Sequence, residues 1–122
     1  MPDELRGRVA LVTGSSQGHV AVPLTMAPYA ASKGGLNALT RCFARDGAAF
    51  NVTANTVSPG MIVTENILKN LTPEEVEERN ERIPLHRGAT PEEVAGVIVN
   101  TAKCGYMTGE IVNVNGGLWF TP

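Results

Sequence analysis

Several features that mark whole classes of protein are missing from this sequence. No apolar run approaches the roughly 20 residues that span a bilayer, and the charged start, MPDELRGR, lacks the apolar stretch of a signal peptide. The two cysteines, Cys42 and Cys104, match neither a metal-ligand spacing nor a disulfide framework. With 10 basic and 12 acidic side chains the formal net charge is −2, which indicates no surface for nucleic acid or an anionic membrane. We therefore expect a cytoplasmic protein with reduced thiols, no metal, no nucleic-acid partner and no membrane.

The pattern that is present is typical of one small α/β domain over residues 1–122. A length of 122 residues and an apolar fraction of 43% suit a single domain with its own core. Short apolar runs predict three strands, and helical periods or helix starts lie between the last two of them. The predicted strands are 8–13 (RVALVT), 50–60 (FNVTANTVSPG) and 109–117 (GEIVNVNGG). This order predicts a small parallel sheet of three strands with flanking helices.

The first predicted helix, 29–46, has an apolar face and two unusual glycines. Leu36, Leu39 and Phe43 recur at spacings of three and four. Gly47 should end the helix in the left-handed conformation. The glycines 34–35 should each cost about 1 kcal/mol relative to alanine, so we expect another backbone or a ligand to pack closely there.

Two later helix starts share the pattern Thr-Pro-Glu-Glu-Val, at Thr72 and at Thr90. In each, threonine suits the N-cap, proline suits the first helical position, and a glutamate can return to the cap. The pattern predicts two capped helices, the second directing apolar side chains inward.

Tyr29 and Lys33 are four positions apart, so both lie on one face near the start of the first helix. A free tyrosine, with a pKa of about 10, is a poor acid or base at neutral pH. An ammonium group one turn away, at the positive end of the helix dipole, stabilises the phenolate and favours proton transfer. The simpler interpretation of a lone Y-x-x-x-K is a packed tyrosine and a solvated lysine.

Three blocks, PYAASKGGLNALTR, ANTVSPGMIVTENI and YMTGEIVNVNGG, resemble the short-chain dehydrogenase/reductase family in both order and spacing. The resemblance implies that Tyr29 is the general acid that protonates a substrate carbonyl oxygen, or the base that deprotonates an alcohol. It also implies that Lys33 supports Tyr29 and bonds the nicotinamide ribose. Ser16 would hold the carbonyl oxygen, and His19 and Met61 would fall near the substrate.

The same resemblance implies a nicotinamide cofactor, NAD or NADP. Pro59 and Gly60 would turn the chain under the nicotinamide, and Ile62 and Thr64 would contact its carboxamide or the phosphates. The cofactor-binding residues implied are Gly14, Tyr29, Lys33, Pro59, Gly60, Ile62 and Thr64.

The stretch TGSSQGHV fits two separate family motifs at once. Read from the N-terminus it is the glycine turn that holds a pyrophosphate, with Gly14; read back from Tyr29 it is the serine loop, with Ser16. The third glycine, the acidic second strand and the NNAG strand of the family are absent. We therefore expect a family member with its middle removed, a half-Rossmann remnant without the adenine half. Strand 8–13 would then lie beside 51–57, followed by 110–114.

Two functions follow. The first is an NAD(P)(H)-dependent oxidoreductase that reduces a carbonyl or oxidises an alcohol, with 3-oxoacyl thioesters as a candidate substrate class. The second is a catalytically silent, truncated family fragment that acts as an oligomerising or partner-binding module. Because a shortened sheet exposes apolar surface on one edge and on the first helix, a homo-oligomer is expected in either case.

Overall fold

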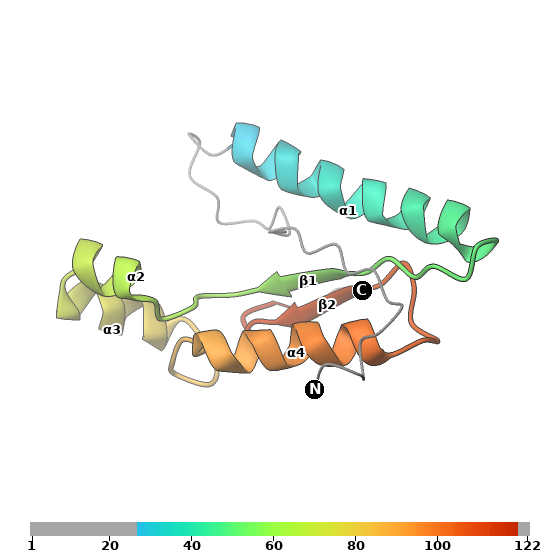
Figure 1. The fold of residues 1–122 in the computed structure, drawn as a ribbon. Helices are drawn as coiled ribbons and strands as arrows, with labels where there is room; N and C mark the ends of the chain where they lie inside the picture. Colours follow the sequence, from blue (N-terminus) through green and yellow to red (C-terminus); the bar gives the residue numbers. More distant parts are fainter. Residues whose placement is uncertain (1–26, 120–122) are drawn as a thin grey trace. The chain divides into compact units, whose positions relative to one another are not determined.

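The computed structural model describes residues 27–119. The predicted strand 8–13 and the residues Gly14, Ser16 and His19 lie outside this range. The described chain contains four helices and two strands (Figure 1). They are α1 (Ala27–Ala48), β1 (Thr56–Pro59), α2 (Glu65–Asn70), α3 (Pro73–Glu81), α4 (Pro91–Lys103) and β2 (Ile111–Val114).

The two strands pair in one sheet, β1 beside β2 (Figure 1). Thr56 N donates to Glu110 O at 2.9 Å, and Gly60 N donates to Val114 O at 2.9 Å. Because the same sequence offset separates both pairs, the strands are parallel. The predicted α/β class, and the neighbouring positions of these two strands, are confirmed.

The chain divides into two compact units: Met1–Ser58 with Ile98–Val112, and Pro59–Val97 with Asn113–Pro122. The assignment of residues 1–122 to one domain stays a prediction.

In the first unit, polar side chains connect α1 and the loop before β2 to the start of β1. The buried Thr56 donates its hydroxyl proton to Thr40 Oγ1 at 2.9 Å, and Thr40 in turn donates to Leu36 O at 2.9 Å. Asn55 Nδ2 donates to Met107 O at 2.8 Å, while its Oδ1 accepts from Glu110 N at 3.1 Å. The start of β1 is therefore fixed by side chains as well as by the strand ladder.

The predicted end of the first helix is wrong in detail. The helix continues to Ala48, and the residue with a positive φ after it is Asn51, at 57°. Gly47 is needed for a different reason: a Cβ there would lie 3.0 Å from Val52 O, where the chain turns back on the helix. No backbone of the described chain packs closely at the glycines 34–35, since a Cβ added at either position would meet no described atom within 4 Å. Close approach of a ligand there stays a prediction.

In the second unit, caps define the helix starts as predicted. Thr72 Oγ1 accepts from Glu75 N at 3.2 Å, and Thr72 N donates to Glu75 Oε2 at 2.8 Å. Thr90 begins α4 in the same reciprocal way with Glu93. Helix α2 was not predicted; it is only six residues long, too short to show a period in the sequence.

Candidate functional site

Tyr29 and Lys33 meet on the first turns of α1, as the spacing predicts. Lys33 Nζ lies over the Tyr29 ring, 5.4 Å from its centroid, at a distance where the cation is attracted to the ring face. The Tyr29 side chain is partly open, with 45% of the residue exposed. The pair therefore places a partly exposed phenol beside a positive charge on the first turns of α1.

The segment that follows β1 approaches the end of β2 closely in the second unit. Gly60 N donates to Val114 O, and a Cβ on Gly60 would lie 3.0 Å from Asn115 Cα. A side chain at this position would press on backbone, which explains the glycine after Pro59 at the strand end.

Beyond Gly60 the chain pairs once more, with the loop before α4. Ile62 forms an isolated parallel bridge with Ala89. In this bridge Met61 O accepts from Ala89 N at 2.9 Å, and Val63 N donates to Ala89 O at 2.8 Å. Backbone groups of successive residues in an extended chain alternate in direction. The N–H and C=O of Ile62 therefore face away from Ala89.

Thr64 acts as the N-cap of α2. Its Oγ1 accepts from Ile67 N at 3.3 Å, so its hydroxyl proton is still available to donate. The capping bond fixes the side chain at the end of the Met61–Val63 segment.

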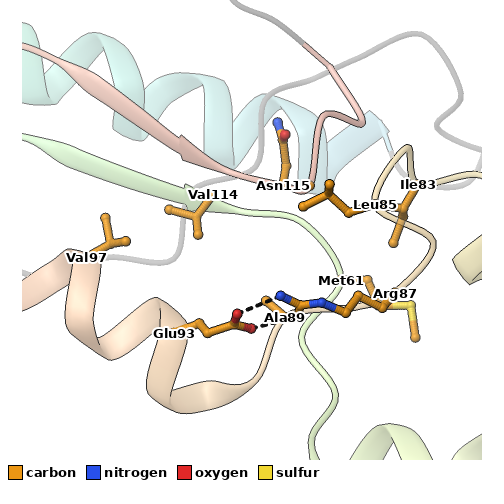
Figure 2. Close-up of a pocket in the computed structure, with 10 residues that line it drawn as sticks. Met61, Ile83, Leu85, Arg87, Ala89, Glu93, Val97, Val114 and Asn115 are labelled. Carbon is orange, nitrogen blue, oxygen red and sulfur yellow. Dashed lines mark hydrogen bonds and ion pairs between the residues drawn. The ribbon is translucent and has the colours of Figure 1, made fainter.

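A cavity of about 190 Å³ lies within this second unit, at the carboxyl ends of both strands (Figure 2). The bound ligands of parallel α/β sheets generally lie outside the carboxyl ends of the strands. Apolar side chains make most of its wall, and Asn115 is held in place by hydrogen bonds from Gly117 N and to Trp119 O. The lining residues are Met61, Ile83, Leu85, Arg87, Ala89, Glu93, Val97, Val114, Asn115 and Gly116.

Arg87 and Glu93 form a two-pronged ion pair beside this cavity (Figure 2). Arg87 Nη1 donates to Glu93 Oε2 at 2.8 Å, and Nη2 donates to Oε1 at 2.7 Å. The hydrogen bond from Arg87, helped by that from Thr90 N, lowers the pKa of Glu93 from 4.5 to about 2. The same bond raises the pKa of Arg87. Sequence reasoning missed this pair; the one available signal was an arginine shortly before a Thr-Pro-Glu-Glu helix start.

The remaining predicted site residues divide between the two units or fall outside the described chain. Tyr29 and Lys33 belong to the first unit, and the segment from Pro59 to Thr64 belongs to the second. Gly14 and Ser16 lie outside residues 27–119. Within those residues no cluster of side chains suits a metal ion, and no helix is long and apolar enough to cross a membrane.

Comparison with known proteins supplies the family. Residues 3–119 match the family described as enoyl-(acyl carrier protein) reductase. A solved short-chain dehydrogenase/reductase of Brucella melitensis, described as a glucose/ribitol dehydrogenase, is 32% identical with a TM-score of 0.78, covering 92% of this chain and 46% of that one. The chain belongs to the short-chain dehydrogenase/reductase family. Its sheet and helices are thus part of a Rossmann-type fold.

Named relatives of this family member include reductases and a dehydrogenase. The 3-oxoacyl-[acyl-carrier-protein] reductase FabG of Buchnera aphidicola is 38% identical over 95 residues, which cover 76% of this chain and 38% of the relative. The 7alpha-hydroxysteroid dehydrogenase of Clostridium sardiniense is 34% identical over 113 residues, covering 91% and 43%. A Pseudomonas aeruginosa RhlG/NADP active-site complex has a TM-score of 0.75 at 28% identity, covering 86% of this chain and 42% of that one.

The chain spans about two fifths of the length of the curated relatives it matches. The matched solved chains are likewise more than twice as long as the part that this chain covers.

The ion pair gives this family member a testable dependence on pH. Because the pKa of Glu93 is lower in the folded chain (about 2) than its ordinary value of 4.5, the pair stabilises the fold above pH 4.5, and the stabilisation is lost as pH falls toward 2. Because the pair is exposed to solvent, we expect the Glu93→Gln variant to melt only slightly below wild type at pH 7, and the two melting temperatures to converge near pH 2. A melting-temperature difference that persists unchanged to pH 2 would contradict this assignment.

Proposed function

We propose that this chain is an NAD(P)(H)-dependent oxidoreductase that interconverts a carbonyl and an alcohol, with Tyr29 as the proton donor and acceptor. The observation that carries the proposal is the Lys33 ammonium over the Tyr29 ring, 5.4 Å from its centroid and one helical turn away. A positive charge held there stabilises the phenolate that remains when Tyr29 gives its proton to the carbonyl oxygen. In the reverse direction the phenolate removes the proton of an alcohol.

The residues after β1 suit the nicotinamide end of the cofactor. A carboxamide has one carbonyl acceptor and one NH₂ donor, and Ile62 directs both a backbone donor and a backbone acceptor away from Ala89. Thr64 retains a hydroxyl proton to donate. Ile62 and Thr64 would hold this end, beyond Pro59 and Gly60 at the end of β1. That Lys33 would bond the ribose rests on the family resemblance. When bound, the nicotinamide supplies or accepts the hydride.

Two further roles rest on the family resemblance. Ser16 would position the carbonyl oxygen for Tyr29, and Gly14 would contact the cofactor if the TGSSQGHV stretch serves as the glycine turn. The absence of the family's acidic second strand and NNAG strand from the sequence supports a site that holds the nicotinamide half without the adenine half.

As the substrate class we propose 3-oxoacyl thioesters. FabG of Buchnera aphidicola is named for 3-oxoacyl-[acyl-carrier-protein], and a relative of Rhizobium meliloti, 41% identical over 98 residues, is named acetoacetyl-CoA reductase. Both names describe a ketone placed β to a thioester. Acetoacetyl-CoA is therefore the probe substrate of choice.

The proposed chemistry is tested by oxidation of NADPH or NADH in the presence of acetoacetyl-CoA. Loss of the proton donor in Tyr29→Phe should lower the rate by a factor of about 10² to 10⁴, with cofactor affinity retained. Lys33→Ala should both weaken binding of the reduced cofactor, followed by its fluorescence, and slow the reaction.

Matched controls are available, since the second tyrosine, Tyr106, is fully exposed and Lys69 lies on α2. Tyr106→Phe and Lys69→Ala should behave as wild type. A Tyr29→Phe variant as active as Tyr106→Phe would rule out the proposed role of Tyr29.

A second candidate function, a catalytically silent fragment that acts as an oligomerising or partner-binding module, is favoured by the surface of α1. Only one described residue of this 22-residue helix, Ala44, is buried, and Leu39 and Phe43 remain 45% and 44% exposed. Apolar side chains left open along a helix favour association with a second copy of the chain.

This association predicts a concentration-dependent sedimentation coefficient. Replacing Leu39 and Phe43 together by serine removes apolar surface without emptying a core position, so the variant should sediment as a monomer while remaining folded by circular dichroism. Wild type that stays monomeric at all concentrations would exclude the self-association. An oligomer with no cofactor binding and no turnover would favour the silent module over the enzyme.

A further inference from the structure

One short stretch of backbone holds the segment proposed to meet the nicotinamide. Met61 and Val63 make their two hydrogen bonds to Ala89, at 2.9 and 2.8 Å. This bridge is isolated and does not extend into a strand. The orientation of the segment therefore depends on how firmly Ala89 is itself held.

The Arg87–Glu93 ion pair fixes the backbone on both sides of Ala89. Arg87 Nη1 donates to Gly88 O at 3.1 Å, and Thr90 N donates to Glu93 Oε2 at 2.9 Å. The carboxylate and the guanidinium are joined by two parallel hydrogen bonds (Figure 2). We call this arrangement of Arg87 and Glu93 the clamp.

The clamped stretch approaches the segment closely at Gly88, where only glycine fits. A Cβ on Gly88 would lie 2.8 Å from Val63 Cγ2 and 3.2 Å from Met61 O. No side chain therefore fits between Gly88 and the segment, and a displacement of the Gly88–Ala89 backbone alters its packing against Met61 and Val63.

The exposure of the clamp argues against a mainly stabilising role. The side chains of Arg87 and Glu93 are 53% and 44% exposed. Ion pairs in contact with solvent contribute little to global stability, whereas two-pronged arginine–carboxylate pairs impose a defined geometry.

We propose that Arg87 and Glu93 are positioning residues for the cofactor: by fixing Ala89 they fix Met61–Val63, and so aim the N–H and C=O of Ile62 at the carboxamide. This inference rests on the proposed function, in which Ile62 contacts the nicotinamide end. It adds two residues that touch neither substrate nor cofactor in that proposal.

The deciding variant is Arg87→Lys, which keeps the positive charge but lacks the planar fork needed for both bonds to Glu93. The first readout is amide hydrogen exchange at Val63 and Ala89 in the protein without cofactor, measured by NMR. The second is the Kd for NADH, measured by fluorescence. Glu93→Gln, which can still accept from Thr90 N, serves as an independent second variant.

The matched control is Arg82→Lys. Arg82 pairs with Glu78 on α3 and makes no hydrogen bond to Gly88 or Thr90 in the described chain. It therefore tests the loss of an arginine–glutamate pair that does not hold the segment.

In Arg87→Lys and Glu93→Gln we expect exchange at Val63 and Ala89 to rise about tenfold, because the local opening that exposes these amides becomes easier. Exchange at Thr56 and Gly60, in the sheet, should not change. The Kd for NADH should rise about three- to tenfold, and Arg82→Lys should match wild type in both readouts.

Unchanged exchange at Val63 and Ala89 overturns the inference, whatever the titration gives. If wild type binds NADH and the Kd does not change in Arg87→Lys, the clamp does not serve the cofactor and the inference also fails. A wild-type chain that binds no NADH is a different result, because it overturns the proposed function on which the inference depends.

Discussion

The pairing of the chain after β1 with two neighbouring backbones is the constraint on which the rest of the second unit depends. Gly60 bonds Val114 at the end of β2, and Met61 and Val63 bond Ala89 before α4. Both contacts require glycine: a side chain at Gly60 would press on Asn115, and a side chain at Gly88 would press on Val63. Held in this way, the extended segment directs the N–H and C=O of Ile62 away from Ala89. This orientation is the basis of the proposed contact with the nicotinamide carboxamide.

Much of the fold could be predicted from local sequence because local interactions determine it. The caps at Thr72 and Thr90 and the helix that carries Tyr29 follow from patterns a few residues long, although this helix begins at Ala27 and not at Tyr29. The parallel pairing of two strands follows from the order of strands and helices along the chain. The helix end at Ala48 was mispredicted because glycine is required at position 47 by the close approach of Val52 in the turn that follows the helix, and not by its own φ. The Arg87–Glu93 pair was missed for a similar reason: its importance comes from the backbone groups it holds, which no periodicity reveals.

In the candidate site, too, some features could be predicted from local sequence and others could not. The spacing of Tyr29 and Lys33 predicted that they share a helix face, and the structure brings them together. Family membership is established by the match over residues 3–119 and by the solved relatives. Catalytic roles, by contrast, depend on where groups from separate parts of the chain meet around a ligand. No single motif determines such an arrangement, so the roles of Ser16, Tyr29 and Ile62 are proposals to be tested.

A comparison of reduced nicotinamide mononucleotide with NADH tests the central claim most directly, because the two differ only in the adenylate half. If the chain holds the nicotinamide end alone, through the segment after β1 and Lys33, both should bind with Kd values within about threefold of each other, and both should weaken in Lys33→Ala. NADH binding more than about tenfold tighter than the mononucleotide would show that the adenine half is recognised. Absence of binding by both would contradict the account of the site.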